Sequence, residues 1–235
     1  MRGRPAGSRI KLLIFDLDGT LVDSAPDISD SLNILRSRYA LPPLTSAYIV
    51  KAIGKGLGYL MSRTLPLSIR RANRSHQQDF RRIYGERIMR RTRAYPGVVR
   101  TLARIKGPVL TLASNKPQRL TVALLRKLGI FGWFKAIICA DRVKRPKPHP
   151  EVILTLMHRF GAEARETLVV GDSRYDMEAG TRAGARTCAV TYGYGTLKEV
   201  AAFKPDYVIG SFPSLLGVIN GTQKRRTGRE RGRKP

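Results

Sequence analysis

Near its N-terminus the chain reads Lys11-Leu12-Leu13-Ile14-Phe15-Asp16-Leu17-Asp18-Gly19-Thr20-Leu21-Val22-Asp23. The uninterrupted apolar segment at 12–15 predicts a short strand that is buried on both faces of a sheet. Asp16 and Asp18 follow this strand two positions apart, so we expect their side chains to point to the same side. The segment therefore predicts a pair of carboxylates at the carboxyl end of a buried strand.

Paired acids at the end of a buried strand need a cation nearby, because an unpaired buried charge is strongly unfavourable. Open parallel sheets bind ligands beyond the carboxyl ends of their strands, where Asp16 and Asp18 would lie. Mg²⁺ prefers oxygen ligands such as carboxylates, so both residues are candidate magnesium ligands. The alternative is a strand that simply enters a polar turn, since Asp-Gly is a common turn pair.

After this strand the hydrophobic pattern becomes helical from residue 24 to residue 94. Ser24 is a candidate N-cap for the first helix, and a long helix is expected over about 68–92. The apolar stripe of that long helix consists of Phe80, Ile83, Tyr84 and Ile88. We expect these helices to form an all-helical cap domain, 24–94, inserted between strands.

From residue 95 onward, short strands alternate with helices. The expected strands are 109–113, 136–139, 167–170, 187–190 and 207–209, and the expected helices are 117–128, 150–160 and 176–183. This alternation predicts an α/β fold with a doubly wound parallel sheet, a Rossmann-like core made of 10–23 and 95–220. Gly161 and Gly184 stand where helices are expected to end. The basic termini, 1–9 and 221–235, are expected to be disordered.

The chain carries 44 Lys and Arg against 17 Asp and Glu, a formal net charge of +27. Such a charge attracts anionic substrates and polyanions without choosing between them, and codon bias in the source genome explains it equally well. Residues 24–94 and the C-terminal tail are basic enough for non-specific contact with nucleic acid. The tail has no interleaved aromatic residues and no nucleic-acid motif.

The composition excludes two classes of protein. No segment approaches the roughly 20 apolar residues of a membrane-spanning helix. The two cysteines, Cys139 and Cys188, stand in apolar runs and form no disulfide framework, so a reducing, cytoplasmic setting is expected.

Three later segments offer partners for the aspartates. Ser114 and the N–H of Asn115 stand between a strand and a helix, where they form either an anion site or an ordinary N-cap. The rigid loop 143–150 carries three cations, Lys144, Arg145 and Lys147, any of which could steady a phosphoryl charge; His149 is expected only to fill this loop. Asp172 ends another buried strand and could share Mg²⁺ with Asp16, while Asp176 begins the next helix.

These segments resemble the four motifs of the haloacid dehalogenase superfamily, in order. Asp-x-Asp-Gly-Thr-Leu-x-Asp is similar to the first motif, Ser114 to the second, Lys147 in Lys-Pro-x-Pro to the third, and Gly-Asp-x-x-x-Asp at 171–176 to the fourth. The resemblance covers about 11–210 and is greatest to the phosphoglycolate phosphatase group with a helical cap. The run Tyr-Pro-Gly-Val at 95–98 is also similar to that group.

The resemblance implies a Mg²⁺-dependent phosphomonoesterase that forms an aspartyl-phosphate. It implies that Asp16 is the nucleophile, that Asp18 is the general acid and base, and that Asp18 also reaches the metal through its backbone carbonyl. The implied metal ligands are Asp16, Asp18 and Asp172, the implied phosphate-binding residues are Ser114, Asn115 and Lys147, and Asp176 supports them.

The expected substrate is a small phosphorylated metabolite, phosphoglycolate or a similar ester. Asp23 is expected to anchor the loop, and Lys55, between Gly54 and Gly56, to pair with a carboxylate or second phosphate of the substrate. A hexose-phosphate mutase, a pyrophosphatase and a phosphatase tethered to nucleic acid are alternatives on the same core.

Overall fold

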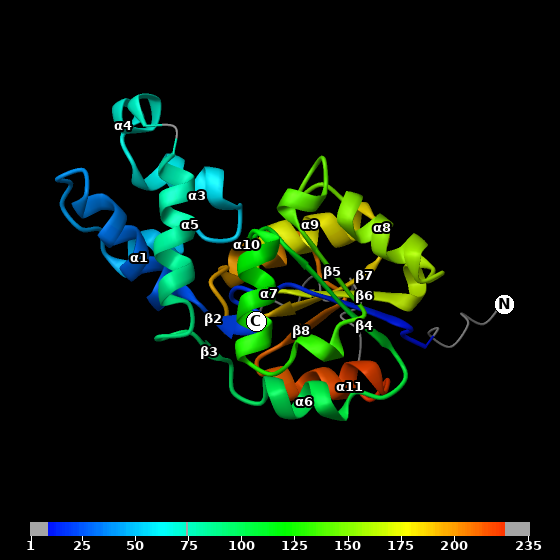
Figure 1. Ribbon diagram of the computed structural model, residues 1–235. Coiled ribbons are helices and arrows are strands. Elements are labelled where there is room, and N and C mark those ends of the chain that lie inside the picture. The colour runs from blue at the N-terminus through cyan, green and yellow to red at the C-terminus, as the bar shows by residue number, and fades with distance from the viewer. Residues whose placement is uncertain (1–8, 74, 224–235) are drawn as a thin grey trace, which may run out of the picture.

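The computed structural model describes residues 9–73 and 75–223, and a six-stranded parallel sheet stands at its centre (Figure 1). The strand order is β5-β4-β1-β6-β7-β8. The strands are β1 (Leu12–Phe15), β4 (Val109–Ser114), β5 (Ala136–Cys139), β6 (Thr167–Gly171), β7 (Arg186–Val190) and β8 (Tyr207–Ile209). All six strands expected from the sequence form, and the doubly wound parallel sheet is confirmed.

Strand β1 lies inside the sheet, between β4 and β6, and is buried on both faces. Leu12 lies opposite Val109 of β4 and Thr167 of β6. Alternate residues of β1 enter two different hydrophobic clusters: Leu13 and Phe15 belong to one, Leu12 and Ile14 to the other. The unbroken apolar run at 12–15 predicts a strand that is buried on both faces, and the structure confirms this.

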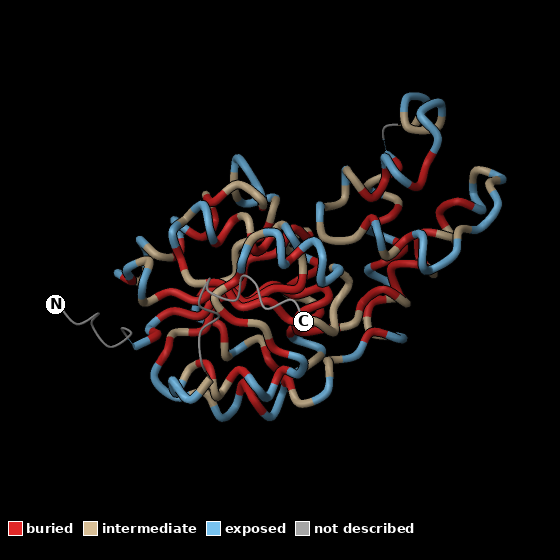
Figure 2. The backbone as a smooth tube through the Cα atoms, turned by 180° about the vertical axis from the view of Figure 1, so that it is seen from behind, coloured by how far each residue is buried: buried red, intermediate tan, exposed pale blue. Residues whose placement is uncertain are grey.

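Helices cover both faces of the sheet (Figures 1 and 2). The clusters of apolar contacts assign α8 (Glu151–Arg159) and α9 (Arg174–Arg182) to one face, and α6 (Val98–Arg104), α7 (Gln118–Lys127) and α11 (Leu215–Ile219) to the other. The remaining short helices of this part are α10 (Leu197–Ala201) and the 3₁₀ helices Phe131–Trp133, Ala140–Arg142, Ala164–Glu166 and Phe212–Ser214. Gly161 and Gly184 directly follow the C-cap residues of α8 and α9, Phe160 and Ala183, and have positive φ angles of 59° and 71°, as expected for helix ends.

The segment between β1 and β4 carries the helical cap, which lies to one side of the sheet in Figure 1. Its helices are α1 (Ala25–Ser37), α2 (Ser46–Val50), α3 (Leu57–Thr64), α4 (Leu67–Ala72) and α5 (His76–Arg87). Leu32 and Leu35 of α1 and Phe80 and Tyr84 of α5 are buried in one cluster. That cluster also contains Phe15 of β1, so cap and sheet share apolar packing.

The structure differs from the expected helix over 68–92 in two places. The first is a break between α4 and α5, where the Asn73 side chain accepts the N–H of Ser75 (2.9 Å) and replaces a helical hydrogen bond with a local turn. The second is the end of α5 at Arg87, before the expected end at residue 92. The chain then enters strand β3 (Arg93–Ala94), which pairs antiparallel with β2 (Val22–Asp23), so the segment 24–94 is not helical to its end as expected. The buried Asp27 carboxylate accepts the N–H groups of Arg91 and Thr92, which holds this segment extended beside α1.

The predicted disorder of 1–9 and 221–235 falls almost wholly outside the described residues. Residues 221–223 are described and are held by hydrogen bonds: Gln223 donates to the carbonyls of Gly217 (3.0 Å) and Val208 (3.3 Å). The folded part thus extends slightly further than expected. Within the described ranges, no helix combines the length and the apolar character that crossing a membrane would require.

Both cysteines are buried as free thiols, and burial raises the pKa of Cys139 to about 12 and also raises that of Cys188. Because the thiolate is the reactive form, neither should react with Ellman's reagent at pH 8 in the native protein. Two thiols should appear once the protein is unfolded in guanidinium chloride. Rapid labelling of one thiol under native conditions would contradict this burial.

Candidate active site

The sheet brings the predicted acids together at the carboxyl ends of β1 and β6. The next strand of the sheet after β1 is β4, on one side, and the next strand after β6 is β7, on the other side. The chain therefore leaves these two neighbouring strands in opposite directions. A crevice is expected at such a reversal of strand order. Asp16 follows β1 and Asp172 follows β6, so parallel pairing alone places them side by side.

Three buried carboxylates converge at this point. Oxygen atoms of Asp16, Asp172 and Asp176 all lie within 4.8 Å of one another. Asp172 accepts hydrogen bonds from the Thr20 hydroxyl (3.0 Å) and the N–H of Tyr194 (2.7 Å). Asp176, in the first turn of α9, accepts the N–H and hydroxyl of Ser173 (3.1 and 2.6 Å). Within the described residues, the Lys147 ammonium is the one hydrogen-bond donor to the Asp16 carboxylate, whereas Asp172 and Asp176 each accept from several groups.

Of the three candidate cations in the loop 143–150, the structure places Lys147 against these acids. Its ammonium lies 2.8 Å from Asp16 Oδ1 and 2.5 Å from Asp176 Oδ1, and it also donates to the carbonyl of Ala113 (2.7 Å). Lys144 and Arg145 instead face outward, where their backbone N–H groups donate to Glu151. His149 accepts the N–H of Glu151 and stays within its own loop.

The protein alone does not neutralise this cluster. Burial raises the pKa of Asp16 well above its ordinary range, and the charge of Lys147 only partly opposes this shift. Burial and the neighbouring Asp176 raise the pKa of Asp172 to about 6. Burial lowers the pKa of Lys147, but the charges of Asp16 and Asp176 outweigh that effect and raise it overall. Three carboxylates facing one ammonium form a donor set that suits a hard divalent cation.

Asp18 points away from this cluster and has its own partners. Its carboxylate accepts the Ser24 hydroxyl (2.5 Å) and two contacts from the Lys116 ammonium (3.0 and 3.1 Å). Ser24 precedes α1 as expected, but its side chain makes no capping bond to the helix. The carboxylates of Asp16 and Asp18 therefore differ in surroundings, the first beside Lys147 and the second beside Lys116.

Lys116 is a site residue that the sequence analysis did not assign. Its side chain is only 5% exposed. Burial lowers its pKa, yet the charge of Asp18 reverses the effect and raises it. The available signal was its place directly after Ser114 and Asn115 at the end of β4, where a lysine can reach the neighbouring strand end.

Ser114 and Asn115 occupy the expected position at the end of β4. Ser114 lines the same cavity as Asp16 and Asp18, and its hydroxyl accepts the N–H of Lys116 (3.2 Å). The Asn115 side chain has an additional role, because it donates to the carbonyls of Gly54 in the cap (2.8 Å) and of Lys147 (2.9 Å). One amide thus joins the cap to the loop that carries the lysine.

Asp23 and Lys55 lie outside the carboxylate cluster. Asp23 accepts the Tyr194 hydroxyl (2.9 Å) and the N–H of Ala25 (3.3 Å), the contacts of a residue that anchors a loop. Lys55 is exposed, and its ammonium lies 4.8 Å from the ring centroid of Tyr59. Among the described residues that line the two cavities beside Asp18, Lys55 does not occur.

Tyr194 was also missed from the sequence. Besides binding Asp172 through its N–H, it accepts with its hydroxyl the N–H groups of Ser24 (2.7 Å) and Ala25 (2.9 Å) at the start of the cap. The available signal was its position between Gly193 and Gly195 after β7. The structure explains these glycines, because a side chain at either position would collide with Asp172. The tyrosine therefore connects the acid cluster to the entrance of the cap.

Two cavities open beside Asp18, between the cap and the core. One has a volume of about 60 Å³ and is walled mainly by apolar side chains of α1, α3, α5 and α7. The other, of about 290 Å³, is more polar and is lined by Lys51, Arg174 and Glu199 among others. A molecule held at Asp16 would extend past Asp18 into one of these cavities.

Known proteins match nearly the whole chain. The haloacid dehalogenase-like hydrolase family matches residues 13–190. The phosphoglycolate phosphatase of Yersinia pseudotuberculosis is 36% identical over 216 residues, which cover 89% of this chain and 93% of that protein. The phosphoglycolate phosphatase of Haemophilus influenzae is 33% identical over 222 residues, 90% of this chain and 99% of that protein.

A solved structure agrees with these sequence relatives. The crystal structure of a predicted phosphoglycolate phosphatase from Haemophilus somnus has a TM-score of 0.83 and 31% sequence identity, and the match covers 93% of this chain and 100% of that one. The chain belongs to the family of haloacid dehalogenase-like hydrolases. Within that family it is a phosphatase that acts on small phosphorylated substrates.

Replacing Lys147 by methionine should destabilise the metal-free protein by about 3–5 kcal/mol, because the buried carboxylates of Asp16 and Asp176 lose their counter-charge. Urea unfolding in the presence of EDTA measures this loss. Lys11→Met is the matched control, because the Lys11 ammonium is exposed and pairs with Glu166 at the surface. The urea midpoint of this variant should hardly differ from that of the wild type. Equal midpoints for the two variants would show that the buried pair carries no stability.

Proposed function

We propose that this phosphatase is a Mg²⁺-dependent phosphomonoesterase that hydrolyses phosphoglycolate through an aspartyl-phosphate on Asp16. The observation that carries the proposal is the position of Asp16, 2.8 Å from Lys147 within a cluster of buried carboxylates and adjacent to Asp18. The names of the relatives from Yersinia and Haemophilus support the choice of substrate.

The residues that would hold Mg²⁺ are Asp16 and Asp172, with Asp18 contributing its backbone carbonyl and Asp176 lying within reach. The excess negative charge and the raised pKa values of Asp16 and Asp172 support this assignment, because both carboxylates are costly to bury without a cation. When bound, the ion would supply positive charge against the phosphoryl oxygens and hold the phosphoryl group in line with the nucleophile.

Asp16 attacks phosphorus with its free carboxylate oxygen while Lys147 holds the other side of the carboxylate. The Ser114 hydroxyl, the N–H of Asn115 and the Lys147 ammonium stabilise the charge on the phosphoryl oxygens. The buried position of Asp16 keeps bulk water away from the bond that forms. This step breaks the bond between phosphorus and the oxygen of the leaving alcohol, and it leaves an acyl phosphate, a mixed anhydride, on Asp16.

Asp18 transfers the protons of both half-reactions. It donates a proton to the oxygen of the leaving alcohol and then takes one from the water that hydrolyses the aspartyl-phosphate. The Ser24 hydroxyl and the Lys116 ammonium hold its carboxylate in one orientation. Because Asp18 is held from two sides, its carboxyl group has a defined position relative to the ester oxygen that it protonates.

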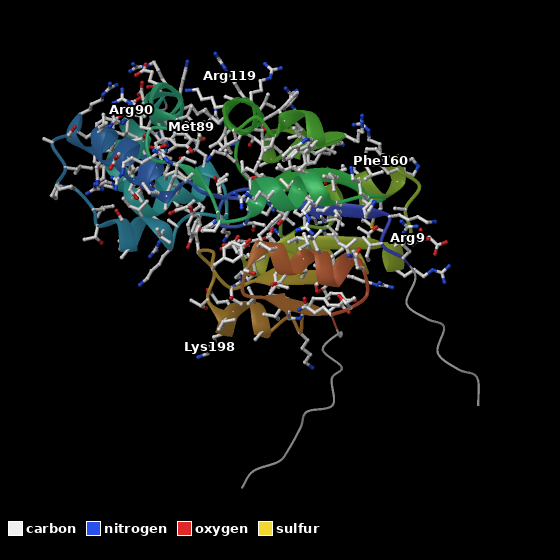
Figure 3. All side chains as sticks on the ribbon, turned by 90° about the horizontal axis from the view of Figure 1, so that it is seen from below. Arg9, Met89, Arg90, Arg119, Phe160 and Lys198 are labelled. Atoms are coloured by element: carbon white, nitrogen blue, oxygen red, sulfur yellow. The ribbon has the colours of Figure 1, made fainter. Side chains whose placement is uncertain are left out.

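Basic side chains project from more than one part of the described surface. Arg90 in the cap, Arg119 of α7 and Lys198 of α10 are exposed and project from different parts of the surface (Figure 3). The predicted contact with nucleic acid stays a prediction, as do the mutase and pyrophosphatase alternatives, because no specific contact favours them over phosphomonoester hydrolysis.

Asp16→Asn should abolish phosphate release from phosphoglycolate, whereas Asp18→Asn should lower kcat by about 10²–10⁴-fold, because only the first removes the nucleophile. Asp30→Asn is the control, since Asp30 lies on α1 in a surface pair with Arg91 and should keep wild-type turnover. A malachite-green assay of released phosphate gives all three rates. Turnover in Asp16→Asn would refute the assignment of the nucleophile.

Mg²⁺ at about 100 times its Kd should raise the melting temperature of the wild type by about 5 °C or more, because it binds only the folded cluster. Asp172→Asn should lose this increase, and Asp30→Asn should keep it. Differential scanning calorimetry with and without EDTA measures the shift apart from activity. An undiminished shift in Asp172→Asn would place the metal elsewhere.

A further inference from the structure

Tyr84, on α5, is one of the residues that line the smaller cavity, and its hydroxyl lies near the Lys116 ammonium. The residue is 1% exposed, and its side chain lines the cavity together with Asp18 and Lys116. Within the described ranges, 9–73 and 75–223, the hydroxyl has no hydrogen-bond partner. Buried hydroxyls without partners are rare in native proteins, and this one belongs to a residue that lines a cavity beside Asp18, which points to a ligand.

The Lys116 ammonium stands beside this hydroxyl. It lies 4.5 Å from the ring centroid of Tyr84 and contacts both carboxylate oxygens of Asp18. Among the described residues that line this cavity, Lys116 is the one that carries a positive charge. Because an ammonium group has three N–H donors, Lys116 can hold Asp18 and still donate to a second acceptor.

The other walls of the cavity restrict what can enter. Ile28, Leu57 and Phe80 supply apolar surface around the cavity. A highly hydroxylated leaving group would leave polar groups unpaired against these walls. A short leaving group with one anionic end matches the one cation, Lys116, among the described residues that line the cavity.

We infer that Tyr84 and Lys116 form the specificity site for the leaving group and bind a carboxylate on the carbon next to the ester oxygen. Asp18 must reach the ester oxygen to protonate it, and Lys116 lies 3.0 Å from Asp18. Only two bonds separate the ester oxygen of phosphoglycolate from its carboxyl carbon. The carboxylate therefore falls beside Lys116, with the Tyr84 hydroxyl as its second donor.

This assignment rests on the proposed function and states which residues select the substrate. It also distinguishes the two cavities, because the larger one offers an anion Lys51 and Arg174 in place of Lys116 and Tyr84. A carboxylate bound there would depend on Lys51 and not on Tyr84.

The test compares two esters of equal length, phosphoglycolate and 2-hydroxyethyl phosphate, in which a hydroxymethyl group replaces the carboxylate. The wild type should prefer phosphoglycolate in kcat/KM. Tyr84→Phe should lower that preference about 10- to 100-fold, mainly through a higher KM, because one hydrogen bond to a charged group is lost. Tyr48→Phe is the matched control: the Tyr48 hydroxyl donates to the carbonyl of Arg63 on the exposed side of the cap, and the preference should not change.

Tyr84→Phe is better suited to this test than Lys116→Met, because Lys116 also contacts Asp18. The phenylalanine variant keeps Asp18 and Lys116 in place and retains the ring that packs on Lys116, so it should fold as the wild type does, and its melting temperature checks this.

An unchanged preference in Tyr84→Phe would overturn the inference, and so would a loss that appears in Lys51→Met instead. A wild type that hydrolyses both esters equally would also overturn it and leave the phosphatase assignment intact. A wild type that hydrolyses neither ester would overturn the proposed substrate, and with it this inference.

Discussion

The arrangement of Lys147 among buried carboxylates is the constraint on which the rest of this structure depends. Asp16, Asp172 and Asp176 are brought within 4.8 Å of one another away from solvent, where like charges repel strongly. One ammonium compensates them only in part. The fold tolerates this arrangement because backbone and hydroxyl donors from several loops share the remaining charge, and because the excess suits a divalent cation.

The loops around the cluster are shaped by how closely they approach it. Gly19 adopts a φ of 87°, and a Cβ at this position would collide with the Asp172 carboxylate. Thr20, the next residue, donates its hydroxyl to the same carboxylate. The turn after β1 therefore combines a glycine that makes room for Asp172 with a side chain that stabilises its charge. The close approach of this turn to the Asp172 carboxylate explains both residues.

The cap belongs to the site as much as the sheet does. Asn115 joins the Lys147 loop to Gly54, Lys116 lies under the ring of Tyr84, and the Tyr194 hydroxyl joins the Asp172 loop to the start of α1. Each of these contacts connects a residue of the core, next to a catalytic or metal-binding group, with a residue of the cap. A movement of the cap would therefore change the surroundings of Asp18 and of the leaving group together.

Local pattern alone determined the six strands, most helices and the strand-end positions of Asp16, Ser114 and Asp172, because burial on both faces and strand–helix alternation leave a direct mark on residue order. Tertiary structure decided the rest. The residue pattern left Lys144, Arg145 and Lys147 as candidates and the family resemblance favoured Lys147, but only the fold places the Lys147 ammonium beside Asp16. The strand at 93–94 formed because Asp27, far away in sequence, holds the preceding residues extended. The partners of Lys116, Tyr84 and Tyr194 lie on other elements, and contacts across such distances leave no periodic signal in the chain.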